Sequence, residues 1–135
     1  MKPSAAPTFA AWVAEMKTTQ TGDPLWTVQA YRLALYAIEC HSFDRQAHRP
    51  LVHAPTFDQL TRAIGSVAAN IAEGYSRSSR ADQNRFYEYA LGSAREAITW
   101  YDTIRIELGV LTDDRQATLI QIRRLLLTTL RTSHY

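Results

Sequence analysis

The fold is decided by the stretch Thr61–Trp100, TRAIGSVAANIAEGYSRSSRADQNRFYEYALGSAREAITW, in which two helical patterns flank a Gly-Tyr-Ser-Arg-Ser-Ser link. In the first half, and just before it, apolar side chains recur at steps of three and four, so they share one stripe of a helix. We therefore expect this helix to face a core. The stripe consists of Phe57, Leu60, Ile64, Val67, Ile71 and Tyr75.

Small side chains lie beside this stripe at Gly65, Ala68, Ala69 and Ala72, where we expect a close contact with another helix. The opposite side of the helix is polar and ends at Gly74, a residue suited to a helix C-cap. Two interpretations of the polar side are open: a solvated face, or a buried or subunit-bridging network with an arginine of the next helix. The network would comprise Asn70, Glu73, Gly74 and Arg85.

The second half begins at Ser78 or Ser79, either of which can act as an N-cap, with Asp82 placed as in a capping box. Its apolar arc is wide, which predicts two interfaces, one with the core and one with a neighbouring subunit. The stripe expected in the core consists of Phe86, Tyr89, Ala90, Ser93, Ala97, Trp100, Ile104 and Leu108. The second stripe, Tyr87, Leu91, Ala94, Ile98 and Tyr101, contains the expected oligomer interface, Tyr87, Leu91 and Ile98.

The run SVAANIAEG at Ser66–Gly74, followed by Arg85-Phe86, ALGS at Ala90–Ser93 and Glu96, resembles the signature of a bacterial four-helix-bundle family, the 23S rRNA intervening-sequence proteins. The resemblance implies an up-and-down antiparallel four-helix bundle that assembles as a ring, a homopentamer. It also places the chain near the accessory variability proteins of diversity-generating retroelements, which bind nucleic acid and a reverse transcriptase. RNA, DNA or a protein are thus the implied partners.

The segments outside this stretch predict an arm and two further long helices. Residues 1–22 form a mobile N-terminal arm, with a short helix where Phe9, Trp12, Val13 and Met16 have helical spacing. Residues 23–135 form the bundle. Its first helix starts at the Asp23-Pro24 cap signal and ends near Asp44. A polar link then leads to Thr56, a suitable N-cap for the central hairpin.

The last helix is expected after Gly109, which can take the left-handed conformation that ends a helix, with Thr112 as N-cap. Its arginines have two interpretations: a solvated helix face, or phosphate contacts for nucleic acid, multiplied around a ring. The candidate contacts are Arg115, Arg123, Arg124 and Arg131, with Arg77, Arg80 and Arg85 as a second cluster at one end of the hairpin.

Length and composition indicate one globular domain of 135 residues that needs no disulfide or metal to fold. The single cysteine, the absence of a signal peptide and the absence of a long apolar run point to the cytoplasm and to no contact with the membrane. Net charge is only +2. Arginine makes up 13 of the 15 basic residues, which suits phosphate recognition or reflects a GC-rich genome.

Motifs for catalysis are missing, so we expect neither an enzyme nor a cofactor. The spacing of His41, His48 and His53 matches no usual zinc pattern, and the glutamates lack the Glu-x-x-His motif of a di-iron bundle. Several aromatic residues could stack on single-stranded bases if they were exposed, although their helical spacing favours packing. These residues are Trp26, Trp100, Tyr87, Tyr89 and Tyr101.

Two functions follow from these observations. The first is a non-enzymatic oligomeric protein that binds nucleic acid, RNA in particular, through arginine patches. The alternative is a scaffold that binds a protein partner without binding nucleic acid, such as a subunit similar to a reverse-transcriptase accessory protein.

Overall fold

The computed structural model describes residues 5–16, 19–48 and 53–132, and these are helical throughout apart from short connections, with no strand. An all-helical fold was predicted, and it is confirmed. Four of the six α-helices in these residues are long: α2 (Gln29–Ala47), α3 (Ala54–Tyr75), α4 (Arg80–Thr103) and α6 (Leu111–Thr132). The other two are α1 (Phe9–Glu15) and α5 (Arg105–Leu108), and there are also two 3₁₀ helices, η1 (Thr19–Gly22) and η2 (Pro24–Thr27).

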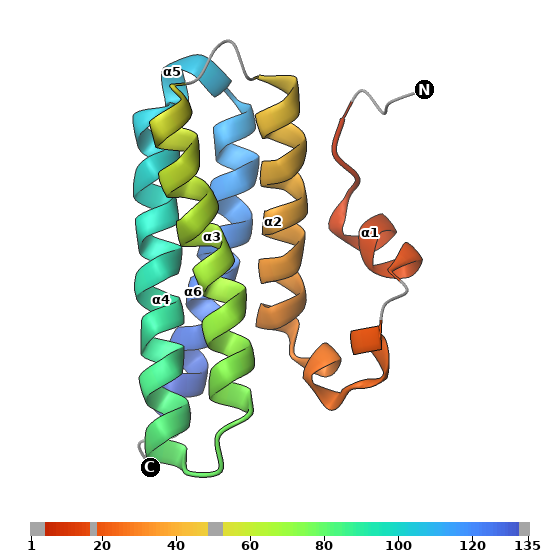
Figure 1. Ribbon diagram of the computed structural model, residues 1–135, viewed down its shortest axis with the longest axis vertical. Helices are drawn as coiled ribbons and strands as arrows, with labels where there is room; N and C mark the ends of the chain where they lie inside the picture. The colour runs from red at the N-terminus through yellow and green to blue at the C-terminus, as the bar shows by residue number, and fades with distance from the viewer. Residues whose placement is uncertain (1–4, 17–18, 49–52, 133–135) are drawn as a thin grey trace.

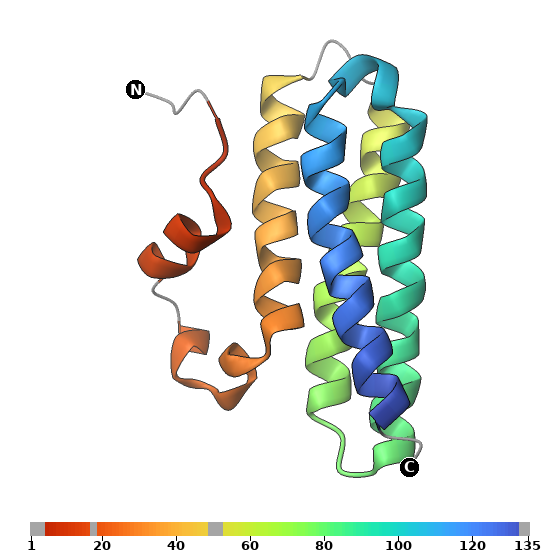
Figure 2. The same ribbon diagram turned by 180° about the vertical axis from the view of Figure 1, so that it is seen from behind.

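The four long helices lie side by side, and each one runs opposite to the one before it (Figure 1). Figure 2 shows the same arrangement from behind. Helix α3 packs against α2 and α4, and α6 packs against the same two helices from the other side, so the four enclose one core.

The core stripe of α3 is confirmed except at its end. Phe57, Leu60, Ile64, Val67 and Ile71 are at most 2% exposed, whereas Tyr75 is 38% exposed. Burial of such side chains contributes roughly 1.5–3 kcal/mol each, so this stripe is a principal source of stability.

The core stripe predicted for α4 is confirmed in part. Ala90 and Ala97 are buried, as are Ile104 and Leu108 beyond the end of the helix, whereas Tyr89 is 54% exposed. The other buried side chains of α4, Leu91, Ala94 and Tyr101, come from the second predicted stripe. Helix α4 contacts α3 and α6 at once, so its buried arc is centred between its two neighbours. The small alanines at the centre of the arc allow both neighbours to approach.

Several predicted helix ends are shifted. Asp23 accepts a hydrogen bond from the Leu25 amide, as a cap does, but it caps η2 rather than α2. The residue before α3 is His53, not Thr56, because Pro55 fits the first turn of the helix. Thr112 lies inside α6 and is fully buried. Gly74 is likewise inside its helix, since α3 continues to Tyr75.

Two caps agree with the sequence. The Ser79 Oγ accepts a hydrogen bond from the Asp82 amide at 3.1 Å, at the start of α4. Gly109 has φ +62° and ψ −139°, backbone angles that only glycine adopts readily, and it directs the chain from α5 into α6.

The N-terminal segment lies alongside α2 and contacts it through aromatic rings (Figure 1). Tyr36 of α2 donates a hydrogen bond to the Pro7 carbonyl at 2.7 Å, and its ring meets those of Phe9 and Trp12 at 5.3 and 5.8 Å. The predicted mobility of this segment stays a prediction. No helix in the described part of the chain is long and apolar enough to cross a membrane.

Candidate nucleic-acid interface

Two arginine clusters that are distant in sequence come to one end of the molecule. The turn between α3 and α4 lies beside the carboxyl end of α6 in both views (Figures 1 and 2). We call this end the arginine end. Its exposed arginines are Arg77, Arg80, Arg85, Arg124 and Arg131.

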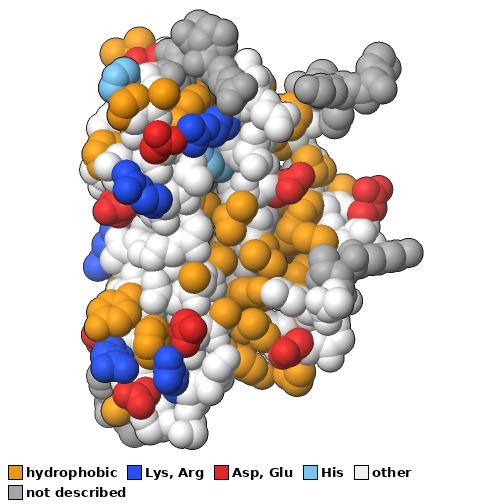
Figure 3. Space-filling model, viewed as in Figure 1, with side chains coloured by type: hydrophobic (Ala, Val, Ile, Leu, Met, Phe, Trp, Pro, Cys, Tyr) orange, Lys and Arg blue, Asp and Glu red, His pale blue; other side chains and the backbone are white. Residues whose placement is uncertain are grey.

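At the turn, the arginines surround an aromatic ring. The guanidinium carbons of Arg77 and Arg85 lie over the Phe86 ring, 4.7 and 5.2 Å from its centroid. Each also pairs with an acid of its own helix region: Arg77 with Glu73 at 2.9 Å and Arg85 with Asp82 at 3.6 Å. Figure 3 shows basic, acidic and hydrophobic side chains gathered over this end of α3 and α4.

The other arginines of this end have no acidic partner. Arg80, Arg124 and Arg131 are exposed, and none forms an ion pair with any described residue. Arg123 is half-buried beside the core-facing side of α6. Three of the predicted contacts are thus fully available to a phosphate.

The prediction that Arg115 contacts phosphate is wrong, because its side chain is only 11% exposed and is held by Asp44 of α2. Its Nε and one Nη donate to the two carboxylate oxygens at 2.7 and 2.9 Å. Burial disfavours the charged guanidinium, but the bonds and charge of Asp44 outweigh it and raise the pKa of Arg115. This residue joins α6 to α2.

Within one chain, Asn70 and Glu73 form no network with Arg85, and the subunit-bridging form of this network stays a prediction. Asn70 donates instead to the Ser66 carbonyl and hydroxyl of its own helix, both at 2.9 Å, and Ser93 of α4 donates to that hydroxyl. Serine and asparagine are short, so they fill the narrow gap between α3 and α4 where an arginine would not fit.

Gly74 has a steric role that its position in the sequence motif does not reveal. A Cβ atom at this position would lie 2.7 Å from the Cε1 atom of Tyr87 and 3.1 Å from the Gln83 carbonyl oxygen. The Tyr87 ring therefore packs directly on the α3 backbone. This contact positions the turn that carries the first arginine cluster.

The predicted oligomer interface on α4 is also wrong for one of its residues. Leu91 is only 8% exposed within a single chain and belongs to the hydrophobic core. Tyr87 and Ile98 are half-buried and pack against the core. The three do not form an exposed patch.

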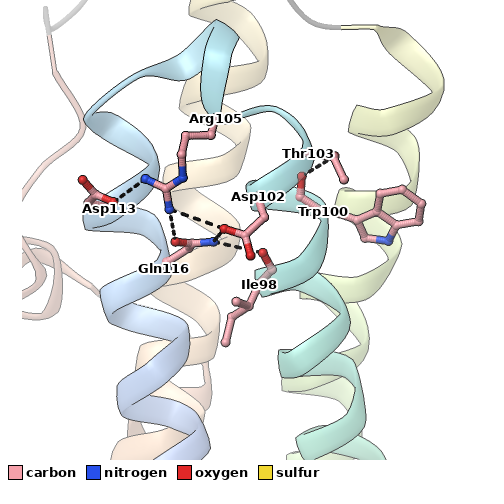
Figure 4. A network of polar contacts seen from close by, with 7 residues as sticks. All are labelled: Ile98, Trp100, Asp102, Thr103, Arg105, Asp113 and Gln116. Atoms are coloured by element: carbon pink, nitrogen blue, oxygen red, sulfur yellow. Dashed lines mark hydrogen bonds and ion pairs between the residues drawn. The ribbon is translucent and has the colours of Figure 1, made fainter.

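At the opposite end of the helices, Arg105 joins side chains of several elements. Arg105 of α5 donates to Asp113 and Gln116 of α6 at 2.6 Å, and Gln116 in turn donates to Asp102 of α4 at 2.7 Å (Figure 4). The bond from Gln116, with help from Arg105, lowers the pKa of Asp102. This network holds the reversal between α4 and α6, and no sequence motif indicated it.

Two other titratable side chains, His41 and Cys40, are buried. Burial lowers the pKa of His41 to about 4, and its Nε2 lies 2.6 Å from the Thr61 hydroxyl of α3. Burial also raises the pKa of the Cys40 thiol. Among the described residues, no three His, Cys, Asp or Glu side chains gather as metal ligands would. The arrangement therefore suits electrostatic and stacking contacts.

Sequence reasoning missed the pairing of arginine with aromatic side chains at the α3–α4 turn. Phe86 and Tyr89 were assigned to the core, yet Tyr89 is 54% exposed and meets the Phe86 ring edge-on at 5.8 Å. The sequence did contain a signal for this pairing, because Arg77, Arg80 and Arg85 lie close to Phe86 and Tyr89 along the chain.

These features define an all-helical protein with a group of exposed arginines at one end. The chain belongs to the family of 23S rRNA-intervening sequence proteins, whose model matches residues 29–130. It is also similar to the crystal structure of a protein of unknown function from the S23 ribosomal protein family of Bacteroides thetaiotaomicron VPI-5482. Sequence identity is 23%, the match covers 76% of this chain and 91% of that one, and the TM-score is 0.64, so the likeness concerns the fold. No curated protein matches significantly.

Proposed function

We propose that this protein binds nucleic acid, RNA in particular, at the arginine end and carries out no chemistry on it. The observation that supports the proposal most is the meeting of two arginine clusters from the α3–α4 turn and from the end of α6. Three of these arginines, Arg80, Arg124 and Arg131, have no acidic partner among the described residues.

The two paired arginines also remain usable. Their partners are exposed and close in sequence, and such surface pairs contribute only about 0–1 kcal/mol. A phosphate oxygen is a better bidentate acceptor for guanidinium than a solvated carboxylate at 3.6 Å. Arg77 and Arg85 can therefore exchange their acids for phosphate at small cost.

The test is a salt series of binding to a structured RNA, comparing the parent with an Arg80→Gln, Arg131→Gln double variant. We expect the double variant to bind more weakly and to lower the salt slope by about 2, one for each lost phosphate contact. The matched control is Arg62→Gln, an exposed arginine in the half of α3 away from the arginine end. An equal loss in the control, or no binding by the parent at about 50 mM salt, would contradict the proposal.

We also propose that the four long helices form an up-and-down four-helix bundle and that copies of it assemble, as a ring, in the cytoplasm. Support comes from a broad hydrophobic area over α2 and towards α1 (Figure 3). Leu35 and Ile38 of α2, and Val28 just before it, are half-exposed apolar residues, and the space beside Gly65 on α3 is open.

Native mass spectrometry tests the assembly. A parent mass of several 15.3 kDa chains that falls to one chain in Leu35→Glu would support it, and a parent mass of one chain would contradict it. The same apolar area favours the alternative function, a scaffold for a protein partner. That alternative predicts recovery of one stoichiometric protein after nuclease treatment, with no binding of RNA by the purified chain.

A further inference from the structure

Tyr89 is an aromatic side chain that the fold leaves uncovered at the arginine end. It is 54% exposed, on the first half of α4, one helical turn after Phe86. The two rings meet at 5.8 Å with an interplanar angle of 89°, so Phe86 supports Tyr89 in an edge-to-face contact. An exposed ring held by a neighbour is suited to contact with a flat partner.

Two arginines border the neighbouring ring. Arg77 and Arg85 both lie over Phe86, and each has an exposed acidic partner, Glu73 or Asp82, that a phosphate can replace. We call Phe86 and Tyr89 the aromatic platform. Guanidinium groups border it on the side of the turn.

The other aromatic residues that could have stacked on bases are not available. Tyr101 is 1% exposed, and Trp26, Trp100 and Tyr87 pack partly against the core. Tyr75, the remaining exposed tyrosine at this end, makes no ring contact with any described residue. Exposure, support and adjacent arginines coincide at Tyr89 alone among these six residues.

A nucleotide supplies both a flat base and an adjacent phosphate. Bases in a duplex are stacked on one another and cannot reach a protein ring, whereas unpaired bases can stack on aromatic side chains while arginines contact the neighbouring phosphates. We propose that the aromatic platform stacks an unpaired base, so that the protein prefers single-stranded nucleic acid to duplex. The proposal rests on the nucleic-acid binding proposed above.

The experiment measures binding of a labelled 12-nucleotide single-stranded RNA and of the matching blunt duplex by fluorescence anisotropy. Tyr89→Ala is expected to weaken binding of the single strand by about 5- to 100-fold, the usual effect of one lost stacking contact, and to leave duplex binding within about twofold. Tyr89→Phe keeps the ring and is expected to bind as the parent does. Tyr75→Ala is the matched control, since it removes a tyrosine from the same end without touching the platform.

The salt slope separates this proposal from the proposed function. Tyr89→Ala is expected to keep the slope of the parent, because its phosphate contacts remain. Unchanged single-strand binding in Tyr89→Ala, or an equal loss with duplex, would overturn the stacking proposal while leaving the arginine contacts in place. No binding by the parent to either ligand would overturn both. A protein partner retained by the parent and lost in Tyr89→Ala, with no RNA bound, would assign the platform to that protein and also overturn the proposal.

Discussion

The two ends of the long helices use the same residue type in opposite ways. At the end that carries α5, each ion pair joins different elements: Arg115 to Asp44, Arg105 to Asp113, and Arg45 to Asp58. At the arginine end, the pairs lie within one stretch of helix, at i,i+4 or i,i+3, and three arginines have none. Ion pairs thus fasten the helices to one another at the end that carries α5. At the arginine end apolar packing holds the helices together, and the arginines are exposed.

Breaking the pair between Asp44 and Arg115 is expected to have the largest effect. Asp44→Ala leaves a buried guanidinium without its partner, so the free energy of unfolding should fall by about 3–5 kcal/mol. Asp58→Ala is the matched control, because its pair with Arg45 is largely exposed and should contribute less than about 1 kcal/mol. Urea unfolding of both variants measures the difference. Similar losses would show that the two pairs are equivalent and remove the first half of the comparison.

Acid should weaken the fastened end through His41. Its pKa is about 4 in the folded chain and 6.5 when unfolded, so the unfolded state takes up the proton first as pH falls. Stability from this group is present above pH 6.5 and is lost towards pH 4, by up to roughly 3 kcal/mol.

His41→Gln removes this titration. Urea unfolding between pH 7 and 4 should therefore show the parent losing more stability than the variant over this range. Parallel curves for the two proteins would contradict the role given to His41.

Gly74→Ala tests whether apolar packing holds the helices together at the arginine end. The new Cβ would overlap the Tyr87 ring, so we expect a loss of roughly 1–3 kcal/mol despite the better helix propensity of alanine. Gly92→Ala is the matched control: it lies exposed in the middle of α4 with no atom near its Cβ, and should gain up to about 1 kcal/mol. Thermal unfolding reports both changes. A gain in both would mean that Tyr87 moves aside freely.

The smallest effect on stability is expected from Glu73→Gln. It removes an exposed i,i+4 pair, which should change the free energy of unfolding by less than about 0.5 kcal/mol. Affinity for RNA should nevertheless rise, roughly twofold to fivefold, since one negative charge is lost beside the proposed phosphate contacts. Glu107→Gln makes the same charge change at the other end and should leave affinity unchanged. An equal rise in both variants would indicate that net charge alone matters.

Sequence reasoning succeeded where large apolar side chains mark the buried face of a helix and failed where small ones do. The stripe of α3 is regular because large side chains line its buried face from Phe57 to Ile71. The buried face of α4 is rich in alanines, which carry too weak a hydrophobic signal to mark the centre of its arc. Periodicity therefore placed Tyr89 in the core and Leu91 at a subunit interface, whereas within one chain Tyr89 is exposed and Leu91 is buried.

The arginines show the same limit in electrostatic form. A sequence shows where the arginines lie along the chain, and both clusters of the arginine end were predicted from it. It does not reveal which carboxylate a given arginine meets, and Asp44 lies 71 residues from Arg115. This single tertiary contact makes Arg115 a link between α6 and α2 rather than a surface residue that could bind phosphate.

This separation along the chain also has a consequence for folding kinetics. The hairpin of α3 and α4 forms from neighbouring segments, whereas the Asp44–Arg115 pair closes a long loop and is expected to form after the rate-limiting step. Its loss in Asp44→Ala should then accelerate unfolding and leave the folding rate nearly unchanged, as stopped-flow chevron plots would record. On this view the pair sets how long a folded molecule lasts rather than how quickly it folds.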